Sequence, residues 1–431
     1  IENYAQVVEE VDQETKKKTV KQIFPRYHQI DVVESLLADV KRYGVGKRYL
    51  IQHSAGSGKS NSIAWLAHQL IGLERDGRPM IDSVLVVTDR RILDKQIRDT
   101  IKQFMQVQNT VAWAEHSGDL RKAIQEGKRI IVTTIEKFPY VVPDIGAEHK
   151  DRRFAVIIDE AHSGQSGRNS AQMNLALSGL ASDDEMDNED KINAMMEGRK
   201  LLQNASYFAF TATPKNKTLE TFGIPYQDGD KIKHRPFHVY TMKQAIQEGF
   251  ILDVLKYYTP IDSYYRLMKT VEDDPMFDKK RAQKKLRSFV ESDSYTISQK
   301  AQMMVDHFHE QVIAKGKIGG QARVMVVTAS IPRCIEYYYA INKCLAARHS
   351  PYKSIIAFSG EHKYQNKEPP LTSAAMNGFP DASIPKTFKK DPYRLLIVAD
   401  MFQTGFDEPL LHTMYVDKML YDIKAVQTLS R

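Results

Sequence analysis

The feature that most constrains this chain is a glycine-rich turn at residues 53–60, placed between a short apolar run and an amphipathic helical pattern. The turn reads His-Ser-Ala-Gly-Ser-Gly-Lys-Ser and follows the apolar run 49–51, separated from it only by Gln52. After it, apolar residues recur at the 3.6-residue spacing that marks one buried helix face: Ile63, Leu66, Ala67, Leu70 and Ile71. The order predicts a strand, a tight turn and a helix.

The residue types in this turn suit the phosphates of a nucleotide. Gly56 and Gly58 let the backbone turn its N–H groups inward, Lys59 can place a charge on the outer phosphates, and the Ser60 hydroxyl can hold a magnesium ion. The expected nucleotide-binding residues here are Ala55, Gly56, Ser57, Gly58, Lys59 and Ser60. His53 departs from the usual pattern, which has glycine first. A plain glycine-rich turn before a helix is the alternative, but such a turn needs no Lys-Ser.

A second motif is the acidic pair Asp159-Glu160, which directly follows the apolar run 154–158. The carboxyl end of a buried parallel strand is where open α/β sheets bind ligands. Asp159 can hold magnesium, directly or through water, and Glu160 can orient and deprotonate the attacking water. Charged pairs also end strands without any such role. The position of this pair after the phosphate turn favours the catalytic interpretation.

Two series of apolar runs, separated by helical stretches, predict an α/β fold with two domains built on parallel sheets. The runs are nearly continuous, as in strands covered on both faces. The expected strands are 49–52, 83–88, 129–134, 154–158 and 207–211, followed by 323–328, 353–358, 394–398 and 413–416.

The expected domains are 22–250 and 251–431, the second with a charged helical insertion at about 262–318. Residues 1–13 have apolar positions at helical spacing and 14–21 are polar and basic, so 1–21 is expected to be a helix followed by a linker. The acidic run 183–190 is expected to be a solvated loop.

Composition bounds the class of protein. A net charge of +7 and a pI near 9.0 permit a polyanionic partner such as nucleic acid. No apolar run approaches the ~20 residues needed to cross a bilayer, so no membrane association is expected. The two cysteines, Cys334 and Cys344, are too few for a disulfide framework, which fits the cytoplasm.

The run Asp-Glu-Ala-His at 159–162, after the phosphate turn, resembles superfamily 2 helicases and translocases, whose motor is two RecA-like domains with ATP between them. The segment 24–29 resembles their adenine-reading segment, which assigns Arg26 and Gln29 to the nucleotide, the Gln29 amide pairing with adenine. Residues 211–214 resemble motif III, so Thr211 and Thr213 are expected to couple the ATP site to the nucleic-acid groove.

The same resemblance supplies contacts to the nucleic-acid backbone and to the far side of the ATP. Segments 88–91 and 133–134 resemble motifs Ia and Ib, and 328–330 resembles motif IV. The implied DNA-binding residues are Arg90, Arg91, Thr134, Thr328, Ser330 and Thr404. Residues 399–407 resemble motif V, with Gly405 and Asp407 facing the nucleotide. Residues 427–431 resemble the opening of motif VI, which makes Arg431 a catalytic arginine.

Longer segments, at 24–29, 53–62, 239–254 and 398–416, resemble the motor subunit of type I restriction–modification enzymes. That resemblance implies an ATP-driven translocase on double-stranded DNA, held by methylation and specificity subunits. The nuclease motif that precedes the motor in that family has no credible copy in this chain, which reads as a piece of a longer polypeptide. Two alternatives are a strand-separating DEAH-type helicase for DNA or RNA and a non-hydrolysing nucleotide-binding scaffold. The set Lys59, Ser60, Asp159 and Glu160 argues against the scaffold.

Overall fold

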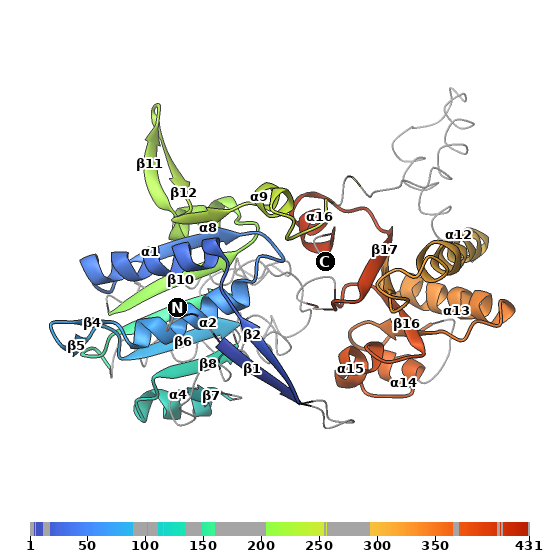
Figure 1. Ribbon diagram of the computed structural model, residues 1–431, viewed down its shortest axis with the longest axis horizontal. Helices are drawn as coiled ribbons and strands as arrows, with labels where there is room; N and C mark the ends of the chain where they lie inside the picture. Colours follow the sequence, from blue (N-terminus) through green and yellow to red (C-terminus); the bar gives the residue numbers. More distant parts are fainter. Residues whose placement is uncertain are drawn as a thin grey trace. The chain divides into compact units, whose positions relative to one another are not determined.

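In the computed structural model the chain forms two compact units, Ile1–Leu252 and Asp253–Arg431 (Figure 1). The predicted boundary followed residue 250. The structure describes residues 4, 6–11, 18–88, 101, 111–114, 116–134, 149–159, 204–253, 256, 294–364, 370–402, 406 and 408–429. Among these residues, no helix combines the length and the apolar character that a bilayer crossing requires.

The first unit is built on a seven-stranded sheet in the order β13-β3-β10-β9-β6-β8-β7. All neighbouring strands run parallel, which confirms the predicted fold class. The strands are β3 (Arg48–His53), β6 (Ser83–Thr88), β7 (Val111–Trp113), β8 (Ile130–Thr134), β9 (Phe154–Asp159), β10 (Ala205–Thr211) and β13 (His238–Tyr240). Each of the five strands predicted for this domain is present, and β7 and β13 are additional.

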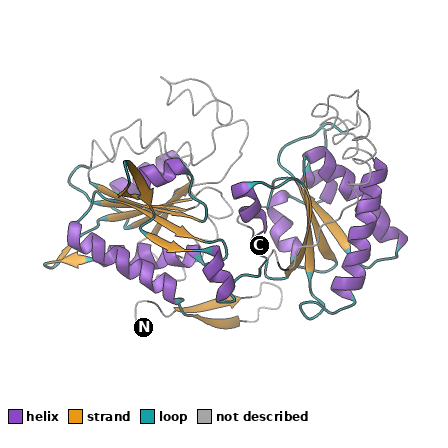
Figure 2. Ribbon diagram, turned by 90° about the horizontal axis from the view of Figure 1, so that it is seen from above, coloured by secondary structure: helices purple, strands orange, loops and turns teal. Residues whose placement is uncertain are grey.

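Helices cover both faces of this sheet (Figure 2). On one face α1 (Tyr27–Tyr43) and α2 (Lys59–Ile71) share a hydrophobic core with the strands. The other core includes side chains of α4 (Ser117–Gln125) and α8 (Asn216–Phe222). The apolar face predicted for 63–71 is buried as expected. Helix α1 ends at Tyr43 and is capped by Gly44, whose φ of 79° suits glycine. A short helix, α9 (Met242–Gln247), follows β13.

The predicted helix at 1–13 is wrong. Residues Gln6–Val11 form strand β1, which pairs antiparallel with β2 (Lys18–Ile23), so the predicted linker also ends inside a strand. The run Gln-Val-Val-Glu-Glu-Val fits a helical spacing over so short a length, but its β-branched valines favour a strand once a partner strand is available.

Two further antiparallel ribbons belong to the first unit. One pairs β4 (Glu74–Arg75) with β5 (Arg78–Pro79). The other pairs β11 (Ile224–Asp228) with β12 (Lys231–Arg235), and Figure 1 shows it projecting beside α8. Nearly all residues of β11 and β12 are exposed, so this ribbon adds little to the core.

The second unit contains a four-stranded parallel sheet in the order β15-β16-β14-β17. Its strands are β14 (Arg323–Thr328), β15 (Lys353–Ala357), β16 (Tyr393–Val398) and β17 (Leu411–Asp417). Its helical elements are α12 (Ser294–His307), the π-helix η4 (Phe308–Ile313), α13 (Ile331–Ala347), α14 (Ser373–Asn377), the 3-10 turn η5 (Asp381–Ser383), α15 (Ile384–Phe388) and α16 (Asp422–Leu429). The predicted helical insertion is helical at 294–313, and its earlier part lies outside the described residues.

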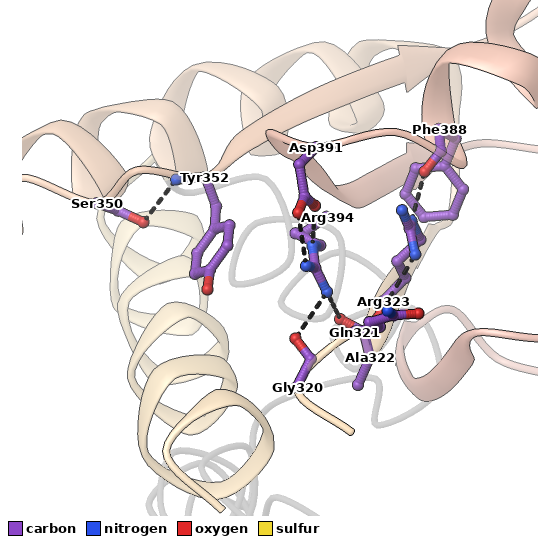
Figure 3. A network of polar contacts seen from close by, with 9 residues as sticks. All are labelled: Gly320, Gln321, Ala322, Arg323, Ser350, Tyr352, Phe388, Asp391 and Arg394. Carbon is purple, nitrogen blue, oxygen red and sulfur yellow. Dashed lines mark hydrogen bonds and ion pairs between the residues drawn. The ribbon is translucent and has the colours of Figure 1, made fainter. Parts of the chain in front are cut away.

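Two buried arginines hold the amino ends of β14 and β16 (Figure 3). Arg323 donates from Nε to the carbonyl oxygen of Phe388. Arg394 donates to both carboxylate oxygens of Asp391, at 2.6 and 3.0 Å, and to the carbonyl oxygen of Gly320 at 3.0 Å. The Arg394 guanidinium holds the pKa of the Asp391 carboxyl below its usual range. Since a buried charge left without its partner is strongly destabilising, these contacts fix this edge of the sheet.

Candidate nucleotide-binding site

Three adjacent strands of the first sheet bring the two predicted motifs together. Strand β3 leads into the glycine-rich turn and β9 ends at Asp159, and the order β3-β10-β9 leaves only β10 between them. In register, Phe210 of β10 pairs with Ile51 on one side and with Asp159 on the other. Neighbouring strands lie about 4.8 Å apart, so the turn and the carboxylate share one edge of the sheet at a separation on the order of 10 Å.

The glycine-rich turn at residues 53–60, the predicted phosphate loop, has the backbone conformation that such a loop requires. Gly56 and Gly58 have φ values of 75° and 77°, in the left-handed region that favours glycine. Lys59 is the first residue of α2 and is 9% exposed. Its Nζ lies 3.4 Å from the carbonyl oxygen of His53 and 3.3 Å from that of Ser54, so it donates to the rim of the loop. The ammonium group therefore lies over the loop, where the phosphates are predicted to bind.

Donor groups around the loop suit an anion. The hydroxyls of Ser54 and Ser57 are buried and find no hydrogen-bond partner among the described residues. The N–H groups at the start of α2 carry the positive end of the helix dipole. A phosphate would accept from such groups, so the loop fits the ligand that its sequence predicted. Ser60 lies in the first turn of α2, half-buried, beside these donors.

His53, the departure from the usual pattern, is a fully buried residue of β3. Its backbone remains in the strand, so this position has no need of glycine. Its Nε2 lies 2.8 Å from Nδ1 of His238, whose Nε2 lies 2.8 Å from a carboxylate oxygen of Asp31. Because the carboxylate accepts, His238 donates to Asp31 from Nε2, and the contact between His53 Nε2 and His238 Nδ1 joins the two rings. The ring thus joins β3 to β13 and, through His238, to α1.

Burial, reinforced by His238, lowers the pKa of His53 to about 2, so the folded protein holds this ring neutral. The unfolded chain takes up a proton on His53 below its ordinary pKa, whereas the folded chain does not, so stability is lost as the pH falls. Between about pH 6.5 and about pH 5, we expect the free energy of unfolding to fall in the wild type and to fall less in His53→Gln. The two decreases should differ by up to roughly 2 kcal/mol. Urea titrations at the two pH values measure this, and equal drops would contradict it.

Gln29 contacts the phosphate loop directly. This residue is 3% exposed, its Oε1 accepts from the backbone N–H of Arg26 at 2.8 Å, and its Nε2 donates to the carbonyl oxygens of Gly58 at 3.0 Å and Ser57 at 3.4 Å. The structure therefore places the predicted base-reading amide at the loop, while its pairing with adenine stays a prediction. The Arg26 guanidinium lies 3.6 Å from the ring centroid of Phe250.

The remaining predicted residues fall into three groups. Thr211 ends β10 at the edge that carries the site, and Thr213 follows it, with the Thr213 N–H donating to the Thr211 hydroxyl at 3.2 Å. Thr134 ends β8 at the same edge, with a buried hydroxyl that has no partner among the described residues.

In the second unit, Thr328 is buried and its hydroxyl donates to the carbonyl oxygen of Val398 at 3.0 Å, whereas Ser330 is the half-buried N-cap residue of α13. Arg90, Arg91, Glu160, Thr404, Gly405, Asp407 and Arg431 lie outside the described residues.

Several residues near the loop were missed by sequence reasoning. His28 lies between the two predicted residues of its segment, and its Nε2 is 3.0 Å from the carbonyl oxygen of Ser57. Its ring stacks on Tyr240, with centroids 3.8 Å apart. The segment 239–254 had been singled out only for its resemblance to a family, without a role for any residue. The signal that could have found them is that Tyr27 and His28, and again His238 and Tyr240, place an aromatic residue and a histidine close together in the sequence.

Comparison with protein families identifies two regions. Residues 28–287 match the SWI2/SNF2 ATPase family, and residues 372–431 match type I restriction enzyme subunit R domain 3. A type I restriction enzyme HindI endonuclease subunit from Haemophilus influenzae is 24% identical over 438 residues, which cover 96% of this chain and 38% of the relative. The chain thus spans less than half the length of that protein.

Solved structures share the fold at low sequence identity. A fragment described as the HsdR subunit of a type I restriction enzyme from Vibrio vulnificus YJ016 aligns with a TM-score of 0.54 and 13% identity, covering 99% of this chain and 70% of the fragment. A DEAD-box helicase bound to single-stranded RNA aligns with a TM-score of 0.51 and 12% identity, covering 94% of this chain and 67% of the helicase. At these identities the likeness concerns the fold alone.

Proposed function

Because the chain belongs to the SWI2/SNF2 ATPase family and carries a type I restriction enzyme subunit R domain, we propose that it is an ATP-driven translocase on double-stranded DNA. In this proposal it acts as the motor part of a longer restriction subunit. ATP is hydrolysed at the phosphate loop of the first unit, with groups from the second unit completing the reaction.

The observation that carries the proposal is the placement of the phosphate loop and Asp159 at one edge of the first sheet, with only β10 between their strands. That edge is where open parallel sheets bind their ligands. The strand between them ends at Thr211, the first residue predicted to couple hydrolysis to nucleic acid. One edge therefore combines the phosphate loop, one proposed magnesium ligand and one proposed coupling residue.

Each residue has a specific role in the proposed reaction. Lys59 and the N–H groups of the loop bind the outer phosphates and stabilise the charge that develops on them. Glu160 takes the proton of the attacking water, and Arg431, Gly405 and Asp407 contact the nucleotide from the second domain. Mg²⁺ would be held by the Ser60 hydroxyl and the Asp159 carboxylate, both oxygen ligands, and would supply charge neutralisation between the phosphates.

We propose non-specific contacts with the DNA backbone, made by loops at the strand ends. Arg90, Arg91, Thr134, Ser330 and Thr404 are the candidates, and the side chain of Thr328 is a weaker one because its hydroxyl donates to the Val398 carbonyl. Such contacts carry no sequence information. Recognition of a DNA sequence would then come from methylation and specificity subunits that hold the motor.

Two displacement assays with the full chain and ATP test this proposal. A duplex translocase displaces the third strand of a triplex without opening a forked duplex, whereas a strand-separating helicase opens the fork. We expect third-strand displacement alone, and Lys59→Ala should abolish it. Fork opening by the wild type would replace the proposal with the helicase alternative, and nucleotide binding without turnover or displacement would favour the scaffold.

A further inference from the structure

The segment Glu248–Ile251, which follows α9, packs against the residues around the phosphate loop. The Glu248 carboxylate accepts hydrogen bonds from two tyrosine hydroxyls, that of Tyr27 at 2.8 Å and that of Tyr240 at 2.7 Å. These bonds hold the pKa of the Glu248 carboxyl below its usual value, and the bond from Tyr240 has the larger effect. Tyr27 begins α1, directly after Arg26, so Glu248 ties this segment to the predicted base-reading region.

The next contact is made by Phe250. The Arg26 guanidinium lies over its ring, and the distance from Cζ of Arg26 to the ring centroid is 3.6 Å, a close cation–π distance. The His28 ring is 6.4 Å from the same ring, and His28 in turn contacts the loop carbonyl of Ser57. Phe250 is 37% exposed, so the ring is held at the surface by Arg26 rather than by a surrounding core.

Ile251 lies on the loop itself. A Cβ built on Gly56 would come within 2.8 Å of Ile251 Cγ2, so the isoleucine methyl group occupies the space directly over this glycine. Gly56 is one of the two residues whose left-handed backbone shapes the phosphate cradle. A change in the backbone at Gly56 would therefore change the space available to Ile251.

The backbone of this segment is held to α9 by two hydrogen bonds. The N–H groups of Phe250 and Ile251 both donate to the carbonyl oxygen of Ala245, at 2.8 and 3.3 Å. Leu252, the next residue, is 74% exposed and is the last residue of the first unit. The chain passes from a contact with the phosphate loop to the start of the second unit within two residues.

We infer that Glu248, Phe250 and Ile251 are positioning residues of the nucleotide site, and that Ile251 transmits the state of the phosphate loop to the chain that enters the second unit. This inference rests on the proposed function, because it requires a nucleotide in the loop. Lys59 donates to the carbonyl oxygens of His53 and Ser54, and a phosphate would compete for this ammonium group. A ligand shifts a conformational equilibrium only through differential contacts, and Ile251 over Gly56 supplies one.

Hydrogen–deuterium exchange of the full chain tests the inference, with Mg–ADP as the probe. We expect saturating Mg–ADP to slow exchange of the Phe250 and Ile251 amides by about threefold or more, since both amides are hydrogen-bonded beside the loop. Lys59→Ala should abolish the slowing. Calorimetry on each protein sets the saturating concentration and reports binding separately. If Mg–ADP does not bind to the wild type, the proposed function fails and the inference with it.

Two neighbouring substitutions separate the contact from a general effect on the segment. Ile251→Ala removes the methyl group over Gly56, and we expect the slowing of the Phe250 amide to fall below about 1.5-fold at saturating Mg–ADP. Leu252→Ala is the matched control, because this exposed side chain should leave the slowing at the wild-type value. Unchanged slowing in Ile251→Ala, or no slowing in a wild type that binds Mg–ADP, would overturn the inference while leaving the proposed function intact.

Discussion

Replacing Lys59 with alanine is expected to lower ATP turnover by at least about a hundredfold, because a preorganised charge at the transferring phosphate contributes several kcal/mol. Lys59 is 9% exposed, and its ammonium group donates to two carbonyl oxygens at the rim of the phosphate loop. Alanine suits the helical backbone of α2 and removes the ammonium group together with the methylene chain that carries it. Steady-state phosphate release, with and without duplex DNA, measures the effect.

A lysine elsewhere on the first unit provides the matched control. Lys122 lies on α4 with a side chain that is 76% exposed, and Lys122→Ala should keep turnover within about twofold of the wild type. Thermal melting of both variants checks that neither has lost its fold. Turnover by a folded Lys59→Ala at the wild-type rate would show that the loop is not the site of hydrolysis.

Asp159→Asn is expected to lower turnover by roughly a hundredfold and to raise the magnesium concentration needed for half-maximal activity. Asp159 is 4% exposed and ends β9, where its carboxylate shares an edge with the phosphate loop. Asparagine preserves the shape and one oxygen but removes the negative charge that a divalent cation prefers. A magnesium titration of ATP hydrolysis distinguishes a weakened metal site from a general loss of activity.

Asp151→Asn serves as the control for this substitution, because Asp151 is an exposed residue near the amino end of the same strand. It should leave the magnesium titration unchanged. Should Asp159→Asn hydrolyse ATP normally at limiting magnesium, the metal assignment would fail, although the phosphate loop could still bind nucleotide.

Most strands of both sheets could be predicted because they are continuous apolar runs, and the central ones are buried throughout, whereas the short strands β7 and β13 at the two edges of the first sheet were not predicted. For β6 and β14 even the bounds were correct, at 83–88 and 323–328. The ribbon strands β11 and β12 were not foreseen, because they are exposed and lack that signal. At residues 6–11 a run of six residues fits either periodicity, and only the pairing with β2 decides between them.

Within the site, local residues were predicted better than distant ones. The loop and Asp159 stand in recognisable local patterns, and the sheet order brings them to one edge. The partner of His53 is His238, 185 residues further along the chain, and no local pattern indicates that contact. The assignment of Thr328 to DNA came from a motif, whereas its burial and its bond to Val398 depend on how β14 and β16 pair.

The contact between Gln29 and Gly58 has a consequence for how relatives of this chain can vary. A Cβ at position 58 would lie 2.6 Å from Nε2 of Gln29, and the φ of 77° already disfavours any side chain there. A relative that replaces Gly58 must therefore also shorten or redirect residue 29. A side chain at position 58 is thus expected only together with a shorter or redirected residue at position 29, which lies 29 residues away, whereas a change at position 29 alone leaves Gly58 unstrained.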